Sequence, residues 1–279
     1  MRVFITGAKG QLGRALQARF EHATVFPADL PVCDILDRAG LMQTVTAFKP
    51  DVVIHAAAMT DVDGCALDPD AAYRINALGT QNVALACQVA RCPLLYISTN
   101  EVFDGAKTEP YLEFDATNPI NAYGRSKLAG EIFVRDLLTR FYIVRLAWLY
   151  GKGGHHFVRK IIRRADEQGS LRVVADEVGS PTYAEDVAGA VRQLVCTGAF
   201  GVYHLVNDGS ASRYDFAREI LRLSGRGHIP IEPIKLSDFS RPSTPPPYTP
   251  LRNFCGKAHG ITLRPWQEAL AEYLALNGC

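Results

Sequence analysis

The 279-residue sequence predicts an α/β fold: a doubly wound parallel sheet followed by a smaller C-terminal α/β domain. Three observations predict it. Short apolar runs alternate with longer amphipathic segments through the first half of the chain, the order expected of βαβ crossovers. A glycine-rich segment separates the first run from the first amphipathic segment. Near residue 150 the regular alternation ends and the elements become shorter.

The expected strands of the first half are apolar on both faces, as parallel strands covered by helices should be. They are residues 2–6, 24–26, 51–55, 94–98 and 142–146. Apolar residues spaced by three and four predict helices within 12–20, 41–48, 77–89 and 128–138. Later in the chain we expect strands at 171–175 and 202–206 and helices at 184–194, 214–223 and 266–276. The proline-rich stretch 242–250 cannot be helical and predicts a loop.

Composition limits the function. Thirty Lys and Arg face 29 Asp and Glu, a formal charge of +1, and 48% of the residues are hydrophobic. This excludes intrinsic disorder and argues against a nucleic-acid or membrane-surface partner, because both need clustered positive charge. No apolar run reaches the roughly 18 residues of a membrane span, and the N-terminus does not resemble a signal peptide. We therefore expect a cytoplasmic protein that acts on small molecules.

Cysteine and histidine patterns predict neither disulfides nor a metal site. The seven cysteines are irregularly spaced and form no Cys-x-x-Cys pair. The adjacent His155 and His156 have no acid or cysteine at ligand spacing. We expect buried, reduced cysteines, apart from an exposed Cys279.

The glycine-rich segment reads G-x-x-G-x-x-G, with glycines at Gly7, Gly10 and Gly13. It follows the first expected strand and opens the first helix, where Gln11 and Leu12 lie between the last two glycines. Such a turn needs glycine for its tight bend, for the approach of a pyrophosphate and for close helix–strand packing. The helix amides then face the phosphates. The sequence therefore predicts a Rossmann-type site for NAD(P), with a cofactor domain of residues 1–150 and a mainly substrate-binding domain of residues 151–279, parts of which return to the first.

An acid follows the second expected strand. Asp29 lies 16 residues after Gly13 and suits the adenosine ribose. Because a carboxylate there repels a 2′-phosphate, Asp29 favours NADH over NADPH, although a neighbouring cation could neutralise it: Arg2, Lys9 or Arg14.

Two further segments suit the cofactor. Asp34 and Ile35 can contact the adenine amino group and ring face, or form an ordinary loop. Small residues, Ala56, Ala57 and Ala58, end the third expected strand, so the backbone there can approach the cofactor closely.

Tyr123 and Lys127 are four residues apart and share one face of an expected helix. A phenol has a pKa near 10, and a neighbouring ammonium group favours the phenolate and makes proton exchange possible near neutral pH. The fourth expected strand ends in Ser98 and Thr99. We prefer Thr99 as the hydroxyl that shares a substrate carbonyl with Tyr123.

Together, these motifs resemble those of a known family, the dTDP-4-dehydrorhamnose reductases, an extended branch of the short-chain dehydrogenase/reductases. The resemblance covers nearly the whole chain. The matching segments are 98–105 (S-T-N-E-V-F-D-G), 119–131 (P-I-N-A-Y-G-R-S-K-L-A-G-E), 145–150 (R-L-A-W-L-Y), 179–186 (G-S-P-T-Y-A-E-D), 201–204 (G-V-Y-H) and 263–266 (L-R-P-W).

The resemblance implies roles for matching residues. Tyr123 would donate the proton and contact the cofactor, Lys127 would assist it and hold the nicotinamide ribose, and Thr99 would polarise the carbonyl. The resemblance also implies hydride transfer from NADH or NADPH to C4 of a nucleotide-linked 4-keto-6-deoxy sugar, giving dTDP-L-rhamnose. The sugar site would be lined by Glu101, Val102, Phe103 and Trp148. Many members dimerise, so a homodimer is compatible with the resemblance.

Two departures from the family pattern concern the substrate. Glu101 replaces a tyrosine beside the catalytic hydroxyl. The late loop reads P-P-P-Y-T-P at 245–250 and lacks the family's Arg-Pro, a bidentate partner for a diphosphate. Candidate substitutes are Arg241, Arg252 and Lys257.

Two alternative functions remain open. The first is a nucleotide-sugar epimerase or dehydratase of the same superfamily, which would retain its cofactor through the reaction. The second is a non-catalytic regulatory subunit that keeps the fold.

Overall fold

The computed structural model describes residues 1–154 and 156–277. The expectations for His155 and Cys279 fall outside these described residues. No helix within them is both long and apolar enough to cross a membrane.

The centre of the molecule is a six-stranded parallel sheet with the order β2–β1–β3–β4–β5–β10. The strands are β1 (Arg2–Thr6), β2 (Thr24–Ala28), β3 (Val52–His55), β4 (Leu94–Thr99), β5 (Phe141–Leu146) and β10 (Gly201–His204). The order reverses between β1 and β3, because β2 lies on the other side of β1. Ligands of such sheets bind at the carboxyl ends of the strands beside this reversal.

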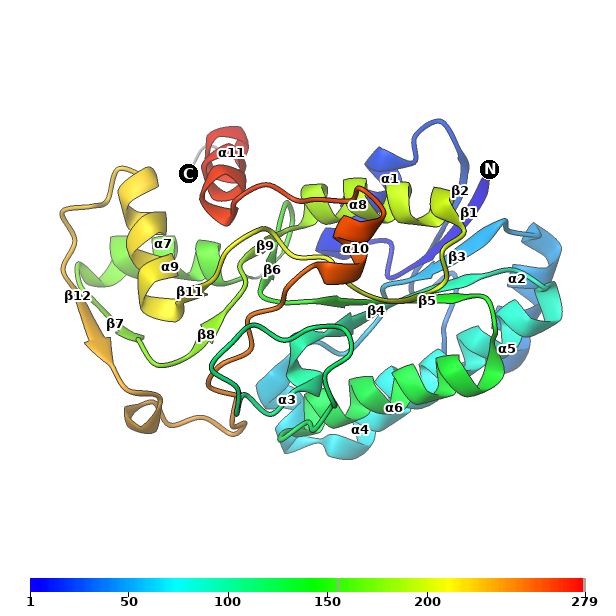
Figure 1. The fold of residues 1–279 in the computed structure, drawn as a ribbon, viewed down its shortest axis with the longest axis horizontal. Coiled ribbons are helices and arrows are strands. Elements are labelled where there is room, and N and C mark those ends of the chain that lie inside the picture. Colours follow the sequence, from blue (N-terminus) through cyan, green and yellow to red (C-terminus); the bar gives the residue numbers. More distant parts are fainter. Residues whose placement is uncertain (155, 278–279) are drawn as a thin grey trace.

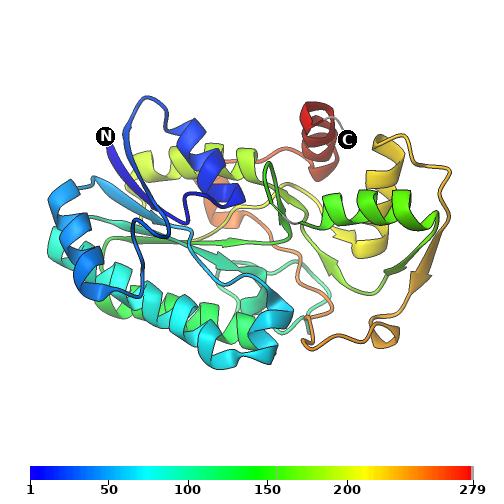
Figure 2. The same cartoon turned by 180° about the vertical axis from the view of Figure 1, so that it is seen from behind.

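Helices cover both faces of the sheet (Figures 1 and 2). One face packs against α2 (Arg38–Phe48), α5 (Thr80–Ala90) and α6 (Ala122–Leu137), and the other against α1 (Gln11–Arg19) and α8 (Ala184–Thr197). Short helices α3 (Val62–Leu67) and α4 (Pro69–Tyr73) precede a π-helical turn, Arg74–Gly79, that continues into α5. This arrangement confirms the predicted Rossmann-type fold.

A second lobe lies beyond one end of the sheet (Figure 1). Its core joins α7 (Phe157–Gln168), α9 (Arg213–Leu223) and α11 (Trp266–Asn277). Its short strands are β6 (Leu149–Tyr150), β7 (Leu171–Val174), β8 (Val178–Gly179), β9 (Thr182–Tyr183), β11 (Ala211–Ser212) and β12 (Ile231–Ile234). The chain enters this lobe after β5, returns to the sheet through α8 and β10, and leaves again. The helix α10 (Phe254–Ala258) packs on β10.

The proline-rich stretch connects the two parts. Residues 241–250, here called the strap, contain no helix. The Asn100 amide donates to the Thr249 hydroxyl at 2.7 Å, and the Val178 amide donates to the Pro247 carbonyl at 2.8 Å. The strap therefore ties the end of β4 to β8 of the second lobe.

The clearest difference from the predicted elements is α7, which the sequence reading omitted. Its buried residues, Val158, Ile161 and Ala165, follow helical spacing, and this signal was available in the sequence. The glycines at 151, 153 and 154 and the change of rhythm directly before the helix concealed it.

Candidate active site

A cleft of about 800 Å³ lies at the carboxyl ends of the central strands, between the sheet and the second lobe. One wall comes from the turns after β1, β2, β3 and β4 and from α6, and the other from residues of the second lobe. Most of the predicted site residues line it: Gly7, Gly10, Gln11, Leu12, Gly13, Asp29, Asp34, Ile35, Ala56, Ala57, Ala58, Thr99, Glu101, Tyr123, Lys127 and Trp148.

The glycine turn requires its glycines. Gly7 has a φ of +68°, and a Cβ there would lie 2.6 Å from the Ala57 nitrogen. At Gly13 a Cβ would overlap the Gly7 carbonyl oxygen. Gly10 is the N-cap of α1 and has no side chain to satisfy the first amides of the helix. The turn therefore offers backbone N–H groups in a space that fits a dinucleotide pyrophosphate.

Asp29 lies at the end of β2, where both its carboxylate oxygens accept backbone amides. Lys9 N donates to Oδ2 and Leu30 N donates to Oδ1, each at 2.8 Å. The Lys9 ammonium donates to the Leu30 carbonyl at 2.6 Å. These bonds hold the carboxylate against the glycine turn, on the side of the cleft where Asp34 and Ile35 also lie.

Tyr123 and Lys127 lie on α6, which begins where the Asn121 side chain accepts the Gly124 amide. Burial raises the pKa of the Tyr123 phenol well above its ordinary value; the Glu101 carboxylate raises it further, whereas a hydrogen bond with the Thr99 hydroxyl lowers it. The phenol is therefore protonated near neutral pH.

Lys127 is almost fully buried, and its ammonium donates to the Ile97 carbonyl at 2.6 Å. Burial lowers the pKa of Lys127 to about 7, while the Glu131 carboxylate opposes this shift. Glu131 in turn forms a buried bidentate pair with Arg145, with distances of 2.8 and 2.9 Å. A buried Glu131–Arg145 ion pair therefore acts on the Lys127 ammonium group.

The two hydroxyls that end β4 point to different partners. Ser98 donates to Glu131 at 2.6 Å inside the protein, whereas the Thr99 hydroxyl donates to Asn100 Oδ1 at 3.3 Å and lowers the pKa of the Tyr123 phenol. Successive strand residues face opposite sides, so only the Thr99 hydroxyl is presented to Tyr123.

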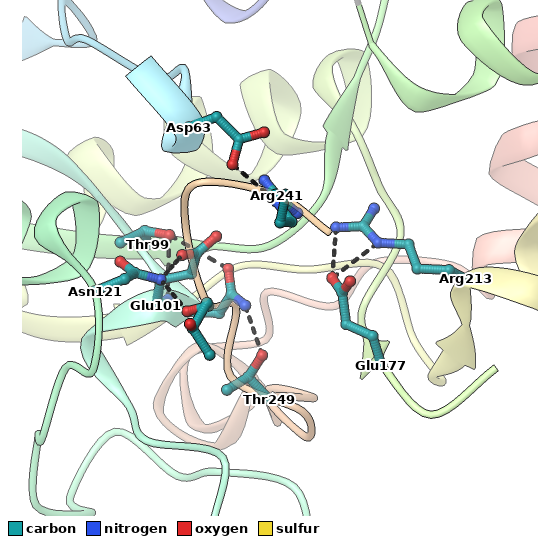
Figure 3. A network of polar contacts seen from close by, with 10 residues as sticks. Asp63, Thr99, Glu101, Asn121, Glu177, Arg213, Arg241 and Thr249 are labelled. Carbon is teal, nitrogen blue, oxygen red and sulfur yellow. Dashed lines mark hydrogen bonds and ion pairs between the residues drawn. The ribbon is translucent and has the colours of Figure 1, made fainter. Parts of the chain in front are cut away.

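Glu101 follows Thr99 in a short 3-10 turn and accepts a hydrogen bond of 2.6 Å from the Asn121 amide (Figure 3). Burial raises the pKa of Glu101 to about 7. The Asn121 hydrogen bond lowers that pKa, Glu177 raises it, and Arg213 and Arg241 lower it. The pKa of Glu101 therefore depends on charged residues of the second lobe, Glu177 and Arg213, and on Arg241 of the strap.

The structure corrects two of the predicted sugar-site residues. Val102 and Phe103 are fully buried and do not line the cleft. They belong to a core cluster with Tyr111, Ala147 and Leu251. The 3-10 turn that follows Thr99 directs Val102 and Phe103 into the core, whereas Asn100 and Glu101 line the cleft.

Trp148 reaches the cleft from the segment between β5 and β6. Its backbone has a φ of +42°, which is uncommon for a bulky residue. The ring packs over Gly179, where a Cβ would lie 2.5 Å from ring carbon Cε2. The glycine of the G-S-P-T segment therefore makes room for the indole.

Sequence reasoning missed several residues of the second-lobe wall: His156, Phe157, Arg213 and Phe216. Arg213 carries no local motif. Its approach to the cleft depends on how α9 packs, and no spacing rule in the sequence reveals that.

Comparisons with known proteins agree with this geometry. The model of the family described as the RmlD substrate binding domain matches residues 1–278. A dTDP-4-dehydrorhamnose reductase of Mycolicibacterium smegmatis is 40% identical over 280 residues, covering 98% of this chain and 85% of the relative. The spore coat polysaccharide biosynthesis protein SpsK of Bacillus subtilis is 36% identical, covering 98% and 96% of the two chains.

Solved structures give the same result. The dTDP-4-dehydrorhamnose reductase of Clostridium acetobutylicum superposes with a TM-score of 0.97 at 41% identity, covering 100% of both chains. The Bacillus anthracis reductase, solved in complex with NADP, gives a TM-score of 0.95 at 39% identity and covers 99% of both chains.

Proposed function

Because this chain belongs to the dTDP-4-dehydrorhamnose reductase family, we propose that it reduces the C4 keto group of dTDP-4-dehydrorhamnose with NADH or NADPH, giving dTDP-L-rhamnose. One observation carries the proposal beyond family membership. A single cleft contains both a glycine turn that fits a pyrophosphate and the cluster of Thr99, Tyr123 and Lys127.

NADH or NADPH held at the glycine turn and by Lys127 would supply a hydride for C4. The protein supplies the proton for the carbonyl oxygen, which becomes a hydroxyl. Tyr123 is the proton donor, since burial keeps its phenol protonated before reaction. The Thr99 hydroxyl, which lines the same cleft as Tyr123, donates to the same carbonyl oxygen and stabilises the charge that develops there.

Lys127 has two roles in this proposal. Its ammonium group stabilises the Tyr123 phenolate left after proton donation, and it holds the nicotinamide ribose. The hydrogen bond of the ammonium group within the described residues goes to the Ile97 carbonyl at 2.6 Å. Glu131 beneath it favours the charged form.

With Val102 and Phe103 buried in the core, Glu101 and Trp148 are the predicted sugar-site residues that line the cleft. Trp148 offers an aromatic face, and Glu101 offers a carboxyl group that can accept from or donate to a sugar hydroxyl near neutral pH. The family's aromatic donor is thereby replaced by an acid, a change expected to alter the choice of sugar.

The test is a turnover assay with dTDP-4-dehydrorhamnose that follows the nicotinamide absorbance. Tyr123→Phe should lower kcat by about 10²- to 10⁴-fold, the usual contribution of a general acid, and leave NADPH affinity unchanged. Tyr214→Phe on α9, outside the cleft lining, is the matched control.

Two results would contradict the proposal. In the first, wild-type protein binds NADH or NADPH but does not oxidise it when dTDP-4-dehydrorhamnose is added, which would show that the protein is not this reductase. NAD that co-purifies tightly and is regenerated in each cycle would identify an epimerase or dehydratase instead.

A further inference from the structure

Arg213 stands out among the charged groups of the cleft. The Asp, Glu, Lys and Arg side chains that line it in the described part of the chain are Asp29, Asp34, Glu101, Lys127 and Arg213. Burial lowers the pKa of Lys127 to about 7, whereas a guanidinium stays charged at any physiological pH. Among the described residues that line the cleft, Arg213 is therefore the one permanent cation, and it belongs to the second lobe.

The guanidinium of Arg213 is held in a fixed orientation. Its Nε and Nη2 both donate to Glu177 Oε1 at 2.9 Å. Its Cζ lies 3.5 Å from the centre of the Trp148 ring and 5.1 Å from that of Phe157. Such stacking and pairing reduce the conformational entropy lost when a ligand binds. Within the described residues, no hydrogen bond uses its Nη1.

The other candidate cations are placed differently. The Arg241 guanidinium pairs with Asp63 at 2.8 Å (Figure 3). Arg241, Arg252 and Lys257 are not among the residues that line the cleft. Of Arg213 and these three candidates, only Arg213 therefore lines the cleft in the described structure.

We propose that Arg213 binds the diphosphate of the sugar-nucleotide substrate. This inference rests on the proposed function, since it assumes that a nucleoside diphosphate enters beside Trp148. A doubly negative diphosphate needs a placed cation in a chain whose formal charge is only +1. A guanidinium whose face stacks on Trp148 presents its edge, and the edge carries the N–H groups that bind phosphate oxygens.

One alternative gives Arg213 a purely structural role. Glu177 has only 8% of its side chain exposed, so Arg213 could serve only to neutralise this buried carboxylate. In that case the loss of Arg213 would weaken anion binding merely by leaving Glu177 unpaired.

The experiment compares three variants by calorimetric titration with dTDP, dTMP and NADPH. The first is Arg213→Gln. The second, called the neutral pair, is the double variant that carries both Arg213→Gln and Glu177→Gln and so removes both charges. The third is Arg222→Gln. Arg222 lies on the same helix in an exposed pair with Glu219 and serves as the control.

We expect both Arg213 variants to raise the Kd for dTDP by about tenfold to a hundredfold, the range for lost charge-assisted hydrogen bonds. The Kd for dTMP should rise less, and the Kd for NADPH should stay within about twofold, since the cofactor phosphates lie at the glycine turn. Arg222→Gln should change none of them.

Wild-type affinity for dTDP in the neutral pair would overturn the inference, because it would show that Arg213 only compensates Glu177. Equal losses for dTDP and NADPH would also overturn it. The proposed function can fail on its own. If the wild-type protein binds dTDP through Arg213 but does not reduce the keto sugar, the inference about the diphosphate site stands and the proposed reductase function is wrong.

Discussion

The two walls of the cleft are built differently. The wall on the sheet side consists of short motifs, each placed at the carboxyl end of a parallel strand: the glycine turn after β1, Asp29 after β2 and Thr99 after β4. The second-lobe wall gathers Trp148, Phe157 and Arg213, and the chain returns to the sheet between Phe157 and Arg213.

This difference separates two kinds of information. The chemistry that we propose for the sheet-side wall needs fixed spacings, so the residues of this wall can be recognised in order along the chain. The substrate contacts that we propose for the second-lobe wall come from side chains that meet only after folding. Variants in the two walls should therefore affect different measurements, and three predictions test this, from the largest effect to the smallest.

Gly7→Ala should damage the sheet-side wall most. A Cβ there collides with the backbone at Ala57, 2.6 Å away, so the turn must move and its amides lose the pyrophosphate. We expect the Kd for NADPH to rise about 100-fold or more, since each charge-assisted hydrogen bond contributes about 1.5–3 kcal/mol.

Gly198→Ala is the control for Gly7→Ala. Gly198 has the same φ of +68° with nothing within 4 Å of the added carbon. It should therefore lose about 1 kcal/mol of stability through its backbone conformation alone and bind NADPH normally. Similar NADPH losses in both variants would contradict the crowding argument.

Glu101→Gln tests the point where the walls meet. The pKa of Glu101 is raised from 4.5 to about 7 in the folded protein, so the folded state binds this proton more tightly than the unfolded chain. The free energy of unfolding should therefore fall as pH rises from about 4.5 to about 7. The variant should lack this fall, which we expect to be on the order of 1–2 kcal/mol for a partly exposed group.

Chemical denaturation across this pH range measures the effect, with the exposed Glu109→Gln as control. Because Arg213 lowers the pKa of Glu101, Arg213→Gln should extend the fall to higher pH. Identical pH dependences for Glu101→Gln and wild type would refute the coupling between the walls.

Asp29→Asn should give the smallest effect. We propose that Asp29 favours NADH, because its carboxylate is held at the ribose side of the cleft by the Lys9 and Leu30 amides. Removing the charge should raise the ratio of kcat/KM for NADPH over NADH by about tenfold, or about 1.4 kcal/mol. Exposed Asp70→Asn should leave the ratio unchanged, and no change in Asp29→Asn would rule out a role for this carboxylate in cofactor choice.

Much of the fold could be predicted because burial leaves periodic patterns in the sequence. The expected strand 2–6 coincides with β1, and the expected helix 184–194 lies within α8 (Ala184–Thr197). Short pairs such as β6 with β9 and β8 with β11 escaped prediction. Two-residue strands carry no periodicity, and only their tertiary neighbours make them strands.

The same physical limit divides the site. The sequence by itself determined the glycine turn and the placement of Thr99, Tyr123 and Lys127 in one cleft, because local strand–turn–helix geometry fixes where motif residues point. Only the tertiary structure decided that Val102 and Phe103 turn into the core and that Arg213 faces the cleft. Those outcomes depend on packing between segments far apart in the chain, such as Arg213 against Trp148 and Glu177, and such long-range contacts leave no pattern in a single sequence.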